Sequence, residues 1–455
     1  MGKTIGMATL VFAAAIVTFL HQDALLPAFL VPAATGMFWC LGAKGHRKYP
    51  LAGIVVLALS GCLALGYSLY PLIENEALVS MRIPFSRLAY DAAFAVIFLS
   101  IVSIFFGGLF FLRPPARRQI EDESNRLEVL VSLHAGKLLA LSVIPLILYI
   151  VGYGPAGLLE RRHYLEMAGP QLIVSASSIF GPVGAVLASI VLIVRRSPRH
   201  LRTTAGLLLG GYFVVMISTG SRAVAVLPLI LLWLFIEFRK PGKLGAAISV
   251  VGSLFSVVVL LNASLVFRLE AVGAGLLPYL DVLTEKSDRL FEVRFGQLVG
   301  NVLFGVPLTG DIVMSGQLDQ QYFWTSINPL PGGLTDWSSI LGELSWGPAT
   351  PFNTFGELYA YGIIYVVMFM FSVGALVSGL DNIISSFDGA LRQTLTLVAV
   401  ISLLLFASAV FQYPVRNASR IVWYLAVVVA GLAMLKSKAL SSQFGTPSLA
   451  RNFDG

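Results

Sequence analysis

Arg222 is the residue of this 455-residue chain whose setting most strongly suggests anion chemistry. It ends the polar break Ser218-Thr219-Gly220-Ser221-Arg222, which separates the apolar runs 203–217 and 223–238. Small hydroxyl and glycine residues let the backbone approach a ligand closely, and a guanidinium fork matches the oxygens of phosphate or pyrophosphate. Ionisable groups between membrane runs are functional candidates, so Ser221 and Arg222 are predicted to bind such an anion.

Arg416 and Arg420 form a second basic pair, just before the last apolar run. They are four residues apart, and Pro414 is a suitable helix start, so both side chains are expected on one helix face. They could join Arg222 on one anion. Alternatively, each arginine reaches a lipid headgroup or pairs with a loop carboxylate.

A carboxylate candidate lies in Asn353-Thr354-Phe355-Gly356-Glu357-Leu358-Tyr359. Asn353 or Thr354 can cap a helix whose first turn contains Glu357, where a carboxylate suits the helix dipole. The alternative is that Glu357 acts as a base, or orients a sugar hydroxyl together with Asn353 and Tyr359.

A shorter charged segment, Glu160-Arg161-Arg162-His163-Tyr164, could supply further ligand contacts. Arg161, Arg162 and Tyr164 are candidate substrate-binding residues, and His163 could transfer a proton. Arg268, just past another apolar run, has the same candidate status. A solvated charge cluster is the alternative for all of them.

The composition indicates a polytopic membrane protein. Hydrophobic residues make up 57% of the chain and charged residues 12%, with a mean hydropathy of +0.83, whereas soluble domains carry about 25% charged residues. The net charge of +7 reflects basic inner loops and is not interpreted as a nucleic-acid-binding surface. The chain has neither a P-loop nor a cluster with metal-ligand spacing, so we expect no ATP-driven transport, no metal and no other cofactor.

The hydropathy pattern predicts an all-α fold with about 12 membrane spans, in a single integral membrane domain over 1–455. The predicted spans are 4–21, 24–43, 50–72, 89–112, 137–154, 171–194, 203–218, 222–238, 244–264, 356–380, 393–412 and 421–435. Most Lys and Arg then fall in inner loops, which favours an N-in, C-in orientation.

A large outer loop is predicted over 265–355, between the ninth and tenth spans. Within it, Asp281–Gly300 has apolar residues spaced for an amphipathic surface helix. Residues 326–355 are rich in Pro, Gly, Trp and Asn, which predicts an ordered but irregular loop.

These features together resemble the Wzy-type oligosaccharide repeat-unit polymerases, which are related to O-antigen polymerases and ligases. The resemblance covers roughly 150–435. It is carried by the Thr219-Gly220-Ser221-Arg222 break, Asn328-Pro329-Leu330-Pro331 in the large loop, the Asn353–Tyr359 segment, and the Arg416/Arg420 pair.

The resemblance implies a bacterial inner-membrane glycosyltransferase of GT-C-like architecture, working on its periplasmic face. Such enzymes are inverting and metal-independent, and join undecaprenyl-pyrophosphate-linked oligosaccharides within the membrane lipid; a chain-length regulator protein is a possible partner, and no nucleic acid is expected. The resemblance implies that Arg222, Arg416 and Arg420 bind the departing pyrophosphate. It also implies that Glu357 activates or positions the acceptor hydroxyl. Related ligases use a histidine in the large loop, which 268–355 lacks.

Two other functions stay open at this stage. A transferase that adds one sugar from a polyprenyl-phosphate donor usually carries an acidic pair in its first outer loop, where this chain has only Asp23. A flippase or transporter of lipid-linked oligosaccharides would also need about 12 spans. Against it, the sequence halves show no evident internal repeat.

Overall fold

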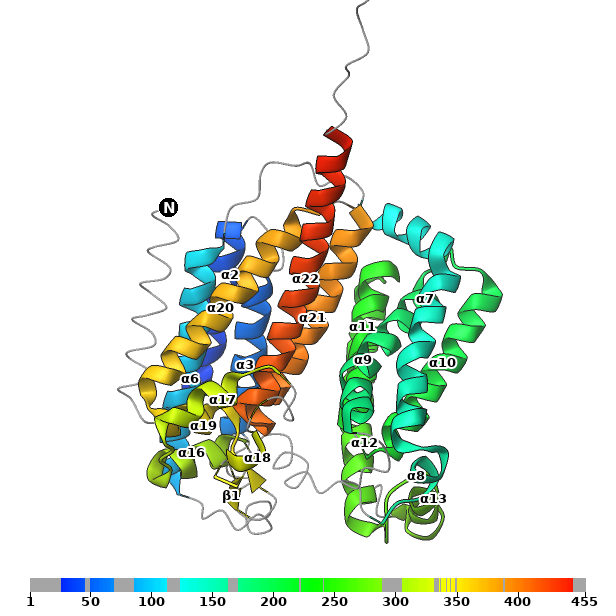
Figure 1. Cartoon of the computed structure of the whole chain (residues 1–455). Helices are drawn as coiled ribbons and strands as arrows, with labels where there is room; N and C mark the ends of the chain where they lie inside the picture. Colours follow the sequence, from blue (N-terminus) through cyan, green and yellow to red (C-terminus); the bar gives the residue numbers. More distant parts are fainter. Residues whose placement is uncertain are drawn as a thin grey trace, which may run out of the picture. The chain divides into compact units, whose positions relative to one another are not determined.

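The structure is a computed structural model in which nearly all of the described residues are helical (Figure 1). The described residues are 26–45, 50–68, 86–112, 123–162, 171–220, 222–239, 241–288, 305–330, 335, 337–340, 342–343, 345–347, 350–387 and 389–444. Among them only β1 (Ser345–Gly347) and β2 (Thr350–Pro351) are strands, and they pair antiparallel. The predicted all-α class is confirmed.

Five described helices are long and apolar enough to cross a membrane. They are Leu88–Phe111, Val131–Tyr153, Arg199–Ser218, Lys243–Arg268 and Ile363–Ser385. A helix satisfies its own backbone hydrogen bonds, which is what a segment without water around it requires. These helices indicate a membrane protein.

The chain folds into two compact units, where the sequence predicts a single domain. Unit 1 comprises residues 1–119 and 299–455, and unit 2 comprises residues 120–298. The boundary at 298–299 falls inside the predicted large outer loop.

Unit 1 contains long helices and, at one end of them, the short elements of the predicted outer loop (Figure 1). Its elements are α2 (Leu26–Gly45), α3 (Leu51–Ser68), α6 (Arg87–Phe111), α16 (Gly305–Ser315), η2 (Gln320–Tyr322), α17 (Phe323–Ile327), α18 (Trp337–Ile340), β1, β2, α19 (Thr354–Tyr361), α20 (Ile363–Ser385), α21 (Gly389–Gln412) and α22 (Val415–Phe444).

The core of unit 1 is built on close packing of α6 against α20. A Cβ atom at Gly107 would overlap the backbone of Phe371, and one at Gly374 would overlap the backbone of Ile104. Small residues let two membrane helices approach at backbone distance. The short helices α16 and α19 pack against α6 and α20 in turn.

Unit 2 is a second bundle. Its elements are α7 (Glu123–Tyr153), α8 (Pro155–Leu159), α9 (Gln171–Ile193), α10 (Arg199–Ser218), η1 (Arg222–Ala225), α11 (Val226–Arg239), α12 (Lys243–Glu270) and α13 (Leu276–Glu285). Inside it, the Ser142 hydroxyl donates to the Gly184 carbonyl at 2.9 Å, and the Tyr212 hydroxyl donates to the Ser142 carbonyl. These bonds tie α7, α9 and α10 together.

Several predicted boundaries require correction. The span expected at 356–380 is two helices, α19 and α20, because Gly362 breaks the helix with a φ of 128°. The amphipathic helix expected over 281–300 begins earlier, as α13 at Leu276. The expected span 4–21 lies outside the described residues.

Candidate functional site

The Arg416 side chain is buried, with 1% of its surface exposed, and it binds the end of α17 and the loop residues that follow it. Its Nη1 donates to the Thr325 carbonyl at 3.0 Å, and its Nη2 donates to the Leu330 carbonyl and the Thr335 hydroxyl, both at 2.6 Å. The guanidinium also lies over the Trp337 ring, 4.4 Å from the ring centre, a favourable cation–π geometry.

Three further side chains on the same face of α22 continue this contact. Arg420 donates to the carbonyls of Pro329 and Leu330, at 3.3 and 2.9 Å. Tyr424 donates to the Pro329 carbonyl at 3.0 Å, and Ser419 to the Ile327 carbonyl at 3.5 Å. We call Arg416, Ser419, Arg420 and Tyr424 the loop anchor.

The loop anchor follows from helical spacing, because residues three and four apart lie along one face of a helix. The expectation that Arg416 and Arg420 share a face is therefore confirmed. Burial, and then the neighbouring Arg420, lower the pKa of Arg416 to about 10. The guanidinium therefore stays charged at neutral pH.

Glu357 is fully buried and holds the start of α22. Its Oε2 accepts the Val415 backbone N–H at 2.8 Å, and its Oε1 accepts the Tyr361 hydroxyl at 3.4 Å. Tyr361 also shares a 2.8 Å hydrogen bond with Ser326. A carboxylate at a helix N-terminus is favoured by the helix dipole.

Burial also gives Glu357 an unusual acidity. Removal from water raises its pKa from 4.5 to about 7, and the hydrogen bonds from Val415, Ser326 and Tyr361 only partly oppose this. A carboxylic acid that titrates near neutral pH can take up or release a proton under physiological conditions.

Asn353 is the predicted cap of the helix that carries Glu357. Its Oδ1 accepts the Gly356 N–H at 2.9 Å, and its Nδ2 donates to the Gly305 carbonyl at 2.7 Å and the Thr309 hydroxyl at 2.8 Å. The capping prediction is confirmed, and Asn353 also links α19 to α16. Tyr359 is half-buried against the apolar core.

In unit 2, two arginines hold the polar break that precedes Arg222. Arg161, 5% exposed, donates to the carbonyls of Gly157 at 2.8 Å and Ser218 at 3.0 Å. Arg268 donates to the Gly220 carbonyl, with its Nε at 3.1 Å. Gly220 adopts a φ of 65°, which a glycine accepts without strain.

This arrangement satisfies the end of α10. The last carbonyls of a helix have no partner within it, and cations favour that end of the helix dipole. The Ser218 hydroxyl adds a bond to the Leu158 carbonyl at 2.6 Å. Residues 218–220 therefore form a fixed turn, and η1 begins at Arg222.

Not every predicted site residue can be placed. The side chain of Arg222, together with Ser221, His163 and Tyr164, lies outside the described residues. Arg416, Arg420, Glu357, Asn353 and Tyr359 belong to unit 1, whereas Arg161, Arg162, Arg222 and Arg268 belong to unit 2. The convergence of Arg222 with Arg416 and Arg420 therefore stays a prediction.

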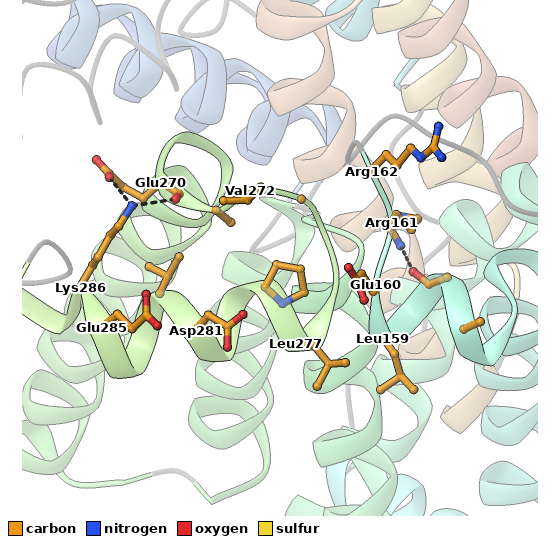
Figure 2. Close-up of a pocket in the computed structure, with 16 residues that line it drawn as sticks. Leu159, Glu160, Arg161, Arg162, Glu270, Val272, Leu277, Asp281, Glu285 and Lys286 are labelled. Atoms are coloured by element: carbon orange, nitrogen blue, oxygen red, sulfur yellow. Dashed lines mark hydrogen bonds and ion pairs between the residues drawn. The ribbon is translucent and has the colours of Figure 1, made fainter.

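A cavity of about 850 Å³ opens beside Arg161 and Arg162, between α8 and α13 (Figure 2). We call it the α8–α13 cavity. Lys286 closes one end by binding the Glu270 carboxylate at 3.3 Å, and the two arginines lie at the other end. Glu160, Asp281 and Glu285 line it between these ends.

The three carboxylates of Glu160, Asp281 and Glu285 are exposed, and none forms a hydrogen bond or ion pair with a described residue. They can accept hydrogen bonds from a ligand rich in hydroxyl groups, while the arginines donate. Asp281 and Glu285 were missed as site residues in the sequence. The sequence could have indicated them, because both are charged positions of the predicted amphipathic helix, and both lie on α13 in the structure.

Within the described part of the chain, no group of three or more His, Cys, Asp or Glu side chains could hold a metal ion. Comparisons with protein-family models, with curated proteins and with solved structures found no match to this chain. The geometry and the sequence are therefore the basis for the functional proposal.

Proposed function

We propose that this chain is a Wzy-type polymerase that joins lipid-linked oligosaccharide repeat units on the periplasmic face of a bacterial inner membrane. In this proposal the chain crosses the membrane about 12 times, with both termini in the cytoplasm and a GT-C-like arrangement. Undecaprenyl-pyrophosphate-linked oligosaccharides are the donor and the acceptor, and a chain-length regulator protein is a candidate partner.

The α8–α13 cavity is the observation that carries the proposal. Its volume of about 850 Å³ lies within the usual range of small-molecule sites, about 300–1,000 Å³. Its polar lining combines three open carboxylates with guanidinium groups, which suits the hydroxyl groups of an oligosaccharide. The same Arg161 that borders it also binds the Ser218 carbonyl, four residues before Arg222.

The proposed reaction needs a cation for the leaving group and an acceptor for one proton. The acceptor hydroxyl attacks the anomeric carbon with inversion, the bond from that carbon to the pyrophosphate oxygen breaks, and the hydroxyl proton passes to a base. Arg222 is assigned the pyrophosphate charge that develops. Glu357 is the candidate base, because its pKa of about 7 suits proton transfer at neutral pH.

The loop anchor refines the expected role of Arg416 and Arg420. Both guanidinium groups donate to the loop at 325–330 in this structure. They therefore contact a pyrophosphate only if some of these bonds are exchanged. In the proposal their role in this structure is to hold residues 325–330 to the start of α22.

The decisive test is an assay of the purified chain in lipid nanodiscs with undecaprenyl-pyrophosphate-linked repeat units, with EDTA present. We expect a ladder of products that differ by whole repeat units. Arg222→Ala should abolish the ladder, whereas Arg199→Ala, an exposed arginine of α10, should leave it unchanged. An unchanged chain-length distribution in Arg222→Ala would overturn the assignment.

The same assay separates the alternatives. Addition of one sugar from a polyprenyl-phosphate donor, with no ladder, would indicate a single-sugar transferase. Movement of intact lipid-linked oligosaccharide across the nanodisc or a vesicle membrane, without any new glycosidic bond, would indicate a flippase.

A further inference from the structure

A second cavity of unit 2, of about 390 Å³, is lined by three arginines, Arg195, Arg202 and Arg239. Its other lining residues are Leu192, Ile193, Phe235 and Pro241. We call it the α9–α11 cavity. It lies where α9 and α11 end and α10 and α12 begin, whereas Arg161 of the α8–α13 cavity binds the other end of α10.

The three arginines come from separate elements that the fold brings together. Arg195 lies in the turn after α9, Arg202 in the first turns of α10, and Arg239 at the last position of α11. Contacts between α9 and α10 and between α9 and α11 hold these ends side by side (Figure 1). Arg202 is oriented by a 3.2 Å bond from its Nε to the Leu192 carbonyl.

The positive charge of the three arginines at this cavity exceeds the negative partial charge of the helix C-termini beside it. The C-termini of α9 and α11 each carry about half a negative charge, which together offset about one arginine. Glu128 of α7 is the acidic group that acts on Arg239, and it lies 3.7 Å from Arg196, outside the cavity. Burial, followed by the charges of Arg195 and Arg202, lowers the pKa of Arg239.

The remaining walls of the cavity are apolar and half-buried. Leu192, Phe235 and Pro241 lie beside the guanidinium groups. Basic pockets between membrane helices at the cytoplasmic surface suit anionic lipid headgroups, with the alkyl part against apolar side chains. Arg239 follows an apolar helix segment, Leu227–Ile236, so the cavity opens where headgroups lie next to such a segment.

We propose that the α9–α11 cavity binds a phosphate group, held by Arg195, Arg202 and Arg239, and supplied by the headgroup of an anionic phospholipid. A phosphate oxygen pair matches the guanidinium fork, and its charge relieves the mutual repulsion of the three arginines. The site is independent of the glycan chemistry proposed above.

The test uses the purified full-length chain in phosphatidylcholine nanodiscs that contain a rising fraction of phosphatidylglycerol. Native mass spectrometry would count bound lipids, and thermal unfolding would report stabilisation. We expect retained phosphatidylglycerol and a higher unfolding temperature. Arg195→Gln/Arg239→Gln should weaken this binding at least tenfold. The matched control is Arg199→Gln/Lys243→Gln, which removes the same charge from exposed positions outside the cavity and should change binding less than twofold.

A parallel arm titrates inorganic phosphate into the protein in neutral detergent. Protection by phosphate that needs Arg195 and Arg239 supports the same site with a soluble source, and protection by phosphatidylglycerol alone supports the lipid headgroup. Equal weakening in both double variants, equal binding of phosphatidylcholine, or no response to either probe would overturn the proposal. For the unmodified chain, binding that survives 0.5 M salt unchanged would also contradict it, because exposed charges are screened.

Discussion

The buried arginines of the two units solve the same physical problem in different places. Arg416 in unit 1 and Arg161 in unit 2 are almost fully buried, and each donates to backbone carbonyls and lies over an aromatic ring, Trp337 or Tyr153. Arg416 holds an irregular loop to the start of a helix, whereas Arg161 holds the end of a helix beside a cavity. In both units, backbone carbonyls thus accept protons of a buried guanidinium group.

The difference between the units concerns what lies next to the arginine. In unit 1 the neighbouring carboxyl group, Glu357, is buried and bonded. In unit 2 the neighbouring carboxylates, Glu160 and Asp281, are exposed at a cavity. Unit 1 is thus expected to respond to changes in packing and pH, and unit 2 to changes in ligand.

Removal of Arg416 should have the largest effect. Arg416→Ala removes three hydrogen bonds and the contact with the Trp337 ring, at a cost of about 3–4 kcal/mol. Arg416→Lys keeps the charge but loses the fork, so it should recover only part of this loss. Thermal unfolding in detergent measures the effect, and Asn417→Ala, an exposed neighbour on α22, is the control. Equal unfolding temperatures for Arg416→Ala and the control would show that the buried Arg416 does not stabilise unit 1.

Glu357 should make stability depend on pH. Its carboxyl group ionises with a pKa of 4.5 in the unfolded chain and about 7 in the folded protein, so folding favours the protonated form. Stability should be full below pH 4.5, fall by about 2–3 kcal/mol as the pH rises to 7, and then level off. Glu357→Gln should remove this slope, as measured by unfolding temperature between pH 4 and 8.

The control for Glu357→Gln is Glu285→Gln, which alters an exposed carboxylate of the α8–α13 cavity and should leave the slope in place. The polymerisation assay adds a second readout. A Glu357→Gln variant that loses the pH slope but retains the product ladder would restrict Glu357 to holding α22.

Arg161→Ala should cost about 2 kcal/mol, because two carbonyls lose their donor. The loss should be local, so hydrogen exchange at the turn 218–220 should rise more than exchange in α7. Arg162→Ala, an exposed neighbour, should cost about 0.5 kcal/mol or less. If Arg161→Ala and Arg162→Ala show the same hydrogen exchange at residues 218–220, Arg161 does not stabilise this turn.

Tyr424→Phe should have the smallest effect, about 1 kcal/mol, because it removes one hydrogen bond to a carbonyl that Arg420 also reaches. Tyr413→Phe is the matched control, since Tyr413 is exposed. A difference in unfolding temperature between them measures the outermost contact of the loop anchor. Identical temperatures would leave the stability of the loop to Arg416, Ser419 and Arg420.

Hydropathy predicted the bounds of the long apolar helices well where an apolar run is continuous, as for α6 and α9. It failed at Gly362, because Ala360, Tyr361 and Ile363 are all apolar and only the glycine marks the break. It also placed the start of α10 four residues late, since a helix can continue past the apolar run through Arg199 and His200.

The sequence predicted which residues belong to the candidate site better than it predicted their hydrogen-bond partners. Arg416, Glu357 and Arg161 were all selected from the sequence, because charges near membrane helices stand out. Their partners were not predictable, since the Leu330 carbonyl is 86 residues from Arg416 and every residue has a carbonyl. Capping by Asn353 was predictable, because it depends on a residue only three positions away.

The shortness of α11 has a consequence for the surrounding lipid. Its 14 residues span about 21 Å at 1.5 Å per residue, whereas the hydrocarbon layer is about 30 Å thick. Hydrophobic mismatch of this size is accommodated by local thinning of the bilayer or by polar groups that carry water inward. If α11 crosses the membrane as proposed, the polar turn at 218–220 lies below the level of the lipid headgroups, and a lipid-linked pyrophosphate reaches Arg222 by a path shorter than the full hydrocarbon thickness.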